Sequence, residues 1–170
     1  MSLSMYQASI PVFIRMLGNL KNIMQKGEEF SREKKIDETV LVNARLSPDM
    51  YPLSRQIQIA CDMARRCGER LAGMEITSVE DNEKTFSELC KRIETTVKFL
   101  ETLKAEQIDG TDEKSISLEL PNGMKLEFTG MTFLLNFVFP NIYFHITTAY
   151  DILRHNGVVL GKLDYIGGPP

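Results

Sequence analysis

The sequence predicts an all-α protein, a bundle of four long helices with one small β-hairpin inserted before the last helix. Most apolar residues recur at intervals of three and four, which places them on one face of a helix. In residues 115–129, apolar and polar residues instead alternate on both sides of Asn122-Gly123, which predicts a hairpin. Strands and helices do not alternate along the chain, so a parallel sheet is not expected.

The composition is that of one globular domain, which we expect to span residues 1–170. The net charge is −3, and Lys and Arg are scattered among acidic residues, which disfavours binding to nucleic acid or to an anionic membrane. Polar residues interrupt every apolar run before the ~20 residues of a membrane span. Residues 1–6 lack the basic and apolar regions of a secretory signal. We therefore expect a cytoplasmic protein.

The three cysteines are predicted to be buried apolar residues. Cys61, Cys67 and Cys90 are odd in number, lie in helical patterns and include no Cys-x-x-Cys pair. A disulfide framework is therefore disfavoured. The sequence also lacks a phosphate-binding glycine-rich loop, a nucleophile elbow and paired metal-binding cysteines.

The first long helix is expected over about residues 5–26. Ser4 and Gln7 have the spacing of a capping box, and Gly27 is a natural stop. Pro11 lies inside the pattern and is expected to kink the helix or delay its start. Residues 28–43 break the pattern and favour two short helical pieces around a turn.

The second long helix is expected to begin at Ser47-Pro48, as an N-cap followed by proline, and to reach about Leu71. Asp49 and Gln56 project among the apolar residues of its inner face, where polar groups need partners. The polar residues that share the outer arc, which we assign to solvent, are Arg55, Gln58, Asp62, Arg65, Arg66 and Glu69.

The third helix follows a cap near Thr77-Ser78 and reaches about Lys104. The last helical region starts at Thr129-Gly130, and Pro140 is expected to break or bend it. Its second half ends at Gly157, the glycine of a left-handed C-cap. Residues 158–170 form a short tail that is rich in glycine and proline at its end.

Several segments together carry a resemblance that spans the chain from Met5 to about Tyr165. They are Ser4-Met-Tyr-Gln-Ala-Ser-Ile-Pro11, Arg45-Leu-Ser-Pro-Asp-Met50, Gln56-Ile-Gln-Ile-Ala-Cys-Asp62, Pro140-Asn-Ile-Tyr-Phe-His145 and Leu153-Arg-His-Asn-Gly157. In these segments the chain resembles a domain-of-unknown-function family of the DinB/YfiT-like superfamily. The resemblance implies a four-helix bundle of up-down-down-up connectivity, often dimeric, with a pocket between helices. In better-known relatives it implies a metal held by three histidines, and in some a thiol-dependent transferase activity.

This sequence departs from that metal pattern. His145 fits the first position of a histidine pair on the last helix, but Ala149 stands four residues on, and the second bundle helix has no histidine. His155 lies ~15 Å of helix away from His145, too far to share an ion with it. We therefore expect no cofactor. A reduced divalent-metal site that joins His145 to Gln56 or Asp49 is the one metal arrangement left open.

Two functional hypotheses remain. In the first, the protein binds an unknown small molecule, with transferase chemistry as one form of that function, in a pocket lined by Asp49, Gln56, His145 and Tyr150. His145 would then act as a general acid or base at the rim of the pocket. In the second, the protein is a non-catalytic homodimer with a structural or interaction role, and His145 is a buried ring bonded to Gln56 or Asp49.

Overall fold

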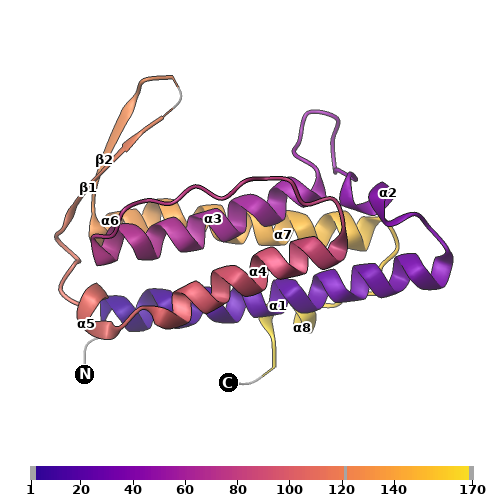
Figure 1. Cartoon of the computed structure of the whole chain (residues 1–170), viewed down its shortest axis with the longest axis horizontal. Helices are drawn as coiled ribbons and strands as arrows, with labels where there is room; N and C mark the ends of the chain where they lie inside the picture. The colour runs from indigo at the N-terminus through magenta and orange to yellow at the C-terminus, as the bar shows by residue number, and fades with distance from the viewer. Residues whose placement is uncertain (1–2, 121, 169–170) are drawn as a thin grey trace.

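The structure, a computed structural model that describes residues 3–120 and 122–168, is a four-helix bundle (Figure 1). Helix α1 (Met5–Lys34) runs in one direction, α3 (Leu53–Ala72) and α4 (Phe86–Thr102) both run back, and α7 (Phe139–His155) runs with α1. The predicted all-α fold and its up-down-down-up connectivity are therefore confirmed. Because α3 and α4 run the same way, residues 73–85 must cross the length of the bundle between them, and we name these residues the crossover segment.

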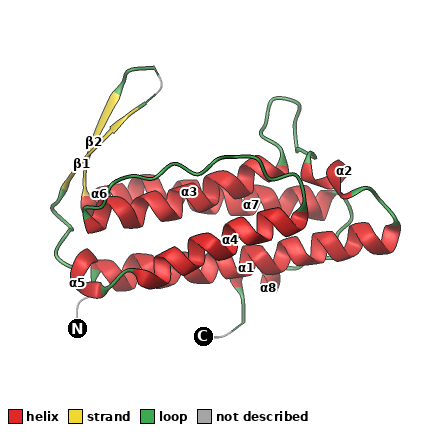
Figure 2. Ribbon diagram, in the orientation of Figure 1, coloured by secondary structure: helices red, strands yellow, loops and turns green. Residues whose placement is uncertain are grey.

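Short elements connect and flank these helices (Figure 2). They are α2 (Glu38–Val42), α5 (Ala105–Ile108), strands β1 (Ser115–Glu119) and β2 (Lys125–Thr129), α6 (Gly130–Phe133), the π-helical turn η1 (Leu134–Val138) and α8 (Lys162–Ile166). The core lies between the long helices, where α1 packs on α4 and α3 packs on α7. Among the described residues, no helix combines the length and the apolar character that crossing a membrane requires.

Helix α1 begins where the sequence predicts but ends later. Ser4 Oγ accepts from the Gln7 backbone N–H at 3.3 Å and Gln7 Oε1 accepts from the Ser4 N–H at 3.2 Å, which completes the capping box. Pro11 lies within the helix and does not delay its start. The expected stop at Gly27 is wrong, because the helix continues to Lys34. Residues 28–34 are thus the end of α1, and only α2 is a separate short piece.

Gly27 marks a close approach between helices. A Cβ atom at this position would lie 2.9 Å from the ring of Phe86 and 3.2 Å from a methyl group of Leu153. Glycine is required here because it lets α1 approach both neighbours. A local sequence pattern cannot distinguish such a glycine from a helix stop.

Helix α3 begins at Leu53, five residues after the predicted start at Pro48. The missed signal is Pro52, the N-cap residue, because a proline disfavours helical backbone in the residue before it. Residues 44–52 instead form turns, closed by a 2.9 Å hydrogen bond from the Leu53 N–H to the Ala44 carbonyl. Asp49 therefore does not lie on a helix.

Helix α4 also begins later than predicted. Its N-cap is Thr85, whose Oγ1 accepts from the Glu88 N–H at 3.1 Å, and not Thr77 or Ser78. Residues before Thr85 belong to the crossover segment, which is extended along the bundle (Figure 1). The end at Thr102 lies close to the predicted one.

The predicted hairpin is present, and its antiparallel strands pair from Ser115 with Thr129 to Glu119 with Lys125. Gly123 has φ +79°, which a turn at Asn-Gly requires, while Pro121 of the predicted turn lies outside the described residues. The base of the hairpin contacts the bundle, and its tip extends away from it (Figure 2).

Pro140 lies in the first turn of α7, and the helical region runs from η1 into α7 without interruption. Of the expected break or bend, the break is therefore wrong. A proline removes one backbone donor and clashes with the preceding turn. The wider turn of η1 (Leu134–Val138) lies directly before it, and such a π-type turn is a known way to accommodate an irregular hydrogen-bond ladder. Gly157 has φ +97° and follows the end of α7, as predicted.

A pair of glycine variants tests the close approach at Gly27. We expect Gly18→Ala to stabilise the protein by about 0.5–1 kcal/mol, because an added Cβ there meets nothing within 4 Å and alanine favours helix. We expect Gly27→Ala to destabilise it by about 1 kcal/mol or more, because the methyl group overpacks the core. Urea unfolding measures both, and an equal gain from the two substitutions would contradict the assignment.

Candidate functional site

His145 and Gln56 are in contact in the seam between α7 and α3. The ring Nδ1 of His145 lies 2.7 Å from Oε1 of Gln56. Both side chains are buried, with exposed fractions of 8% and 1%. The predicted contact between His145 and Gln56 is therefore present, although α3 begins later than the sequence suggested.

The second hydrogen bond of Gln56 fixes the tautomer of the histidine. Gln56 Nε2 donates to the Tyr51 carbonyl at 3.0 Å, so the amide oxygen must face the ring. An amide oxygen only accepts, and Nδ1 of His145 must therefore carry the proton in this contact. The opposite nitrogen, Nε2, is then an unprotonated acceptor.

Nε2 of His145 keeps only a small exposed surface, in a residue that is 8% exposed. This nitrogen makes no hydrogen bond to a described residue. It is not fully buried, because the one fully buried polar side-chain atom without a partner in the described part of the chain is Nε of Arg66. The ring of Phe144 lies edge-on to the imidazole, with centroids 5.2 Å apart. The site therefore presents a hydrogen-bond acceptor beside an aromatic surface.

Burial holds the imidazole in its neutral form. Desolvation lowers the pKa of His145 from 6.5 to about 4, and the positive charge of Arg55 contributes in the same direction. A base with a pKa this low is inefficient at neutral pH, where the best general bases have pKa values near 7. The electrostatics therefore suit a fixed acceptor better than a proton-transfer group.

The other two predicted site residues lie elsewhere. Asp49 is exposed in a turn and accepts from Ser47 Oγ at 2.5 Å, a bond that lowers the pKa of its carboxyl. Its expected place on the inner face of a helix is wrong, because α3 begins only at Leu53. Asp49 therefore has no geometric link to His145.

Tyr150 faces α8 and not Gln56. Its ring packs edge-on against Tyr165, with centroids 6.3 Å apart, and lines a separate cleft of about 190 Å³. Five residues along a helix rotate a side chain by about 140°, which explains why Tyr150 points away from His145. The predicted four-residue pocket is thus reduced to the pair of His145 and Gln56.

The donor atoms at this site do not fit the metal that the superfamily resemblance implies. Ala149, four residues after His145, is buried and offers no ligand, and Nδ1 of His145 is engaged by Gln56. In residues 3–120 and 122–168, no group of three or more His, Cys, Asp or Glu side chains is placed to hold an ion. The histidine that the resemblance would assign to a metal is instead hydrogen-bonded from α7 to Gln56 of α3.

The cysteines are buried and free, as predicted. Burial raises the pKa of Cys61 to about 12 and that of Cys90 to about 11, and it raises the pKa of Cys67 as well. Thiols with raised pKa values are poor nucleophiles at neutral pH. Covalent chemistry through these cysteines is therefore disfavoured.

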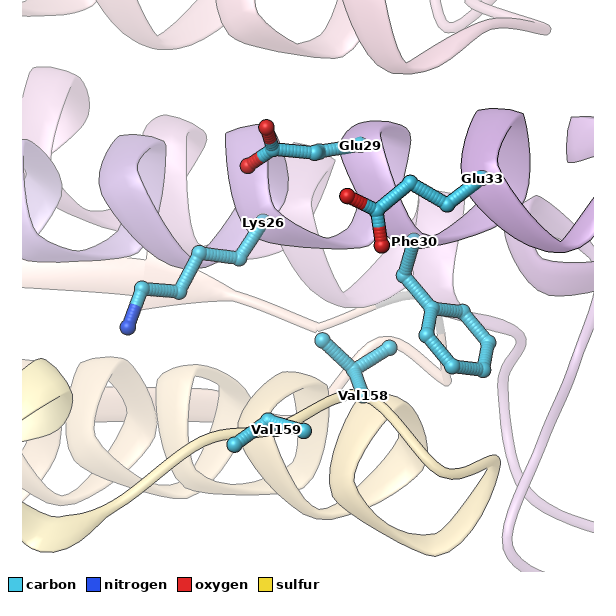
Figure 3. Close-up of a pocket in the computed structure, with 6 residues that line it drawn as sticks. All are labelled: Lys26, Glu29, Phe30, Glu33, Val158 and Val159. Carbon is cyan, nitrogen blue, oxygen red and sulfur yellow. The ribbon is translucent and has the colours of Figure 1, made fainter.

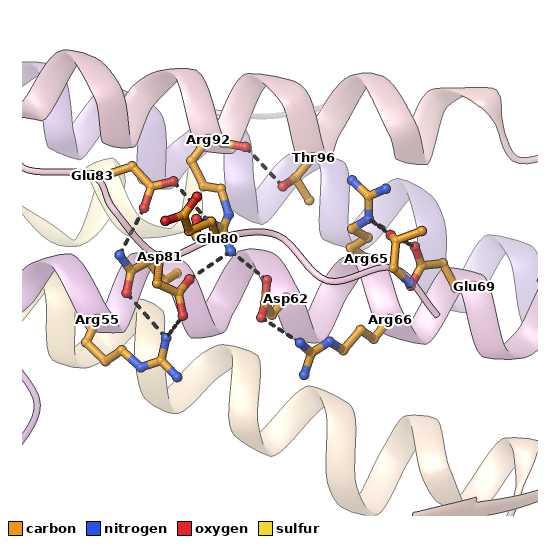
Figure 4. A network of polar contacts seen from close by, with 12 residues as sticks. Arg55, Asp62, Arg65, Arg66, Glu69, Glu80, Asp81, Glu83, Arg92 and Thr96 are labelled. Carbon is orange, nitrogen blue, oxygen red and sulfur yellow. Dashed lines mark hydrogen bonds and ion pairs between the residues drawn. The ribbon is translucent and has the colours of Figure 1, made fainter. Parts of the chain in front are cut away.

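A buried ionic network joins the crossover segment to α3 and α4 (Figure 4). The side chain of Arg92 is only 4% exposed and donates to Asp62 at 2.7 Å, Glu83 at 2.9 Å and Asp81 at 3.1 Å. It also donates to the Glu80 carbonyl at 3.0 Å. The guanidinium is therefore surrounded by four acceptors. A buried charge is tolerated when it has such partners.

The crossover segment covers the arc of α3 that the sequence assigned to solvent. Gln58 is 5% exposed and Glu69 is 1% exposed, and Glu69 accepts from the Thr77 hydroxyl at 2.5 Å. The solvent assignment is therefore wrong for this arc. A signal was available, since Asp81 and Glu83 of the crossover segment are acidic and complement the arginines of the helices.

A surface cleft of about 280 Å³ separates the second half of α1 from residues 158–159 (Figure 3). Its charged lining consists of Lys26, Glu29 and Glu33, and Lys26 Nζ is already paired with Asp164 of α8 at 2.6 Å. The cleft holds neither an imidazole nor a thiol. We assign no chemistry to it.

Replacement of Arg92 tests the network. We expect Arg92→Met to destabilise the protein by about 3–5 kcal/mol, because it leaves Asp62 and Glu83 as partly buried charges without their partner. The crossover segment should also become more sensitive to proteolysis. Lys21→Met, which removes an ion pair with Glu94 on the surface, is the control and should change stability little. A similar response to both substitutions would contradict the role of Arg92.

The lowered pKa of His145 predicts a pH dependence of stability. Between pH 6.5 and about 4 the unfolded chain binds a proton that the folded chain does not, so stability falls as pH falls through this window. The full effect corresponds to about 3 kcal/mol. We expect His145→Asn, which keeps a donor for Gln56 but does not titrate, to lose this component. Parallel stability curves of the two proteins from pH 4 to pH 8 would contradict the prediction.

Comparison with known proteins finds a matching family model and three similar chains among solved structures. The model of a family described as a domain of unknown function (DUF1993) matches residues 5–166. The crystal structure of a DinB family member protein from Shewanella denitrificans is similar over 97% of this chain and 93% of that chain, with 41% sequence identity and a TM-score of 0.88. No curated protein matches the sequence.

Proposed function

This chain belongs to the DUF1993 family and has a DinB-like fold, and we propose that it binds a small molecule at His145 without a metal. One observation carries the proposal. Gln56 fixes Nδ1 of His145 as the protonated nitrogen, which leaves Nε2 as an acceptor without a partner among the described residues. A neutral acceptor held by two helices is suited to orient a ligand that donates a hydrogen bond.

The surroundings of His145 favour a ligand with an aromatic or apolar body. Phe144 is 55% exposed and its ring contacts His145, while Tyr51 is 59% exposed and its backbone carbonyl accepts from Gln56. The guanidinium of Arg55 lies over the Tyr51 ring, 5.9 Å from its centroid. Aromatic surface next to a few fixed polar groups is typical of small-molecule sites.

The proposal assigns binding, and not proton transfer, to His145. Transferase chemistry of the kind that the resemblance implies would need an ion or an efficient base. The described side chains around His145 do not form a set of ligands for an ion. A pKa near 4 makes the imidazole of His145 an inefficient base at neutral pH.

One alternative is favoured by a specific observation. Leu135, Tyr143 and Phe144 are exposed apolar residues of η1 and α7, and exposed apolar residues on one element can mark an interface between proteins. In this alternative the protein is a non-catalytic homodimer, and the bond between His145 and Gln56 only fixes the register of the helices.

The test uses the fact that the chain contains only two histidines. In protein labelled with ¹⁵N-histidine, we expect the spectrum at pH 7 to identify His145 as the Nδ1-protonated tautomer. We expect phenol and indole to shift the Nε2 resonance of His145 but not the resonances of His155. Anisole and N-methylindole have the same shape without the donor, and we expect them to bind at least tenfold more weakly.

His145→Asn provides the matched control, because it keeps the donor to Gln56 and removes Nε2. Loss of phenol binding in this variant, with stability at pH 7 retained, would support the proposal. A protonated Nε2 in the wild type, or equal binding by the donor and non-donor probes, would contradict it. The alternative instead predicts a mass of two chains in sedimentation and no shift of Nε2 with any probe.

A further inference from the structure

A further cleft lies against α3, at the end nearest the hairpin. It has a volume of about 140 Å³. Its lining comes from α3, from the end of β1, and from α6 and η1, and includes Arg66, Arg70, Leu118, Leu120, Phe133 and Phe137. None of these residues contacts the pair of His145 and Gln56, which lies at least two helical turns away along both α3 and α7.

One wall of the cleft is aromatic and well packed. The rings of Phe133 and Phe137 are stacked, with centroids 5.8 Å apart and planes 18° apart. Both rings also contact Phe128 of β2, with centroids 5.8 Å and 5.6 Å away. Each of the two rings thus contacts two other rings, which restrains both, so this wall is a preformed surface for a flat apolar group.

The facing wall carries two arginines one helical turn apart. Nε of Arg66 is buried and has no hydrogen-bond partner, although Nη2 of the same side chain is 3.1 Å from Asp62. A buried donor without a partner is unfavourable, so the remaining donors of Arg66 are the ones that a ligand in the cleft can use.

Arg70 adds a positive charge that the described residues do not neutralise. Its guanidinium makes no ion pair with a described residue. Burial and the neighbouring charge of Arg66 both lower the pKa of Arg70, so the site already disfavours a second cation. Glu119 is the one carboxylate of the lining, and it is exposed and stands opposite Lys125 in the hairpin register. The balance of charge in the cleft favours an anion.

We propose that this cleft binds a small aromatic carboxylate, with its ring against Phe133 and Phe137 and its carboxylate on Arg66 and Arg70. The planar fork of arginine matches a carboxylate. The volume suits a single ring, since an apolar cavity of about 150 Å³ in another protein holds one benzene molecule. The proposal concerns a site separate from His145 and does not depend on the function proposed there.

Benzoate is the probe, measured by isothermal titration calorimetry with the full chain. We expect a dissociation constant of about 1 mM or lower, as is reasonable for a ligand of this size. We expect Arg70→Gln to weaken binding at least tenfold, and Glu119→Gln to strengthen it. Arg154→Gln removes the same charge from an exposed position of α7 outside this cleft and should leave binding unchanged.

Two further ligands test the chemical class. Benzyl alcohol keeps the ring without the charge, and inorganic phosphate keeps a charge without the ring, and we expect both to bind at least tenfold more weakly than benzoate. His145→Asn should bind benzoate as the wild type does, which separates this proposal from the one above. No binding of benzoate, unchanged binding in Arg70→Gln, or phosphate binding as tight as benzoate would overturn the proposal. Circular dichroism of each variant confirms that it is folded.

Discussion

The contacts of Arg92 are the interaction on which the rest of the structure depends. Two adjacent helices that run the same way need a connection as long as the bundle, and such a connection places backbone and acidic side chains over a helix surface. Arg92 binds Asp62 of α3 together with Asp81 and Glu83 of the crossover segment, so one buried cation fixes three parts of the chain. Its removal would leave their carboxylates facing each other in a region of low dielectric.

This arrangement decides which surface of α3 remains available for binding. The crossover segment covers the polar arc that contains Gln58 and Glu69, while the side of α3 that faces α7 holds Gln56 at one end and Arg70 at the other. At Gln56 the seam is closed by a hydrogen bond to His145. At Arg70 it widens into a cleft, because the hairpin and η1 replace the regular packing of α7 on α3. The two proposed sites are thus consequences of one helix pair.

The sequence predicted what depends on local chemistry and helix periodicity. The capping box of Ser4, the hairpin at Asn122-Gly123 and the inward face of Gln56 follow from spacing alone. The sequence left Gln56 and Asp49 open as the partner of His145, and the structure shows Gln56. Asp49 was misplaced because the influence of Pro52 on the helix start was not recognised. Gly27 and the arc of α3 were misassigned because their environment is set by chain segments distant in sequence, which a helical projection does not contain.

Our central proposal is that the protein works without an ion, because the hydrogen bond with Gln56 engages the histidine that the superfamily resemblance would assign to a metal. Elemental analysis combined with native mass spectrometry of the purified, untagged protein tests it most directly. We predict no stoichiometric metal in the wild type, before or after dialysis against zinc, and the same result for His145→Asn. One metal ion per chain in the wild type that is lost in His145→Asn would contradict the claim.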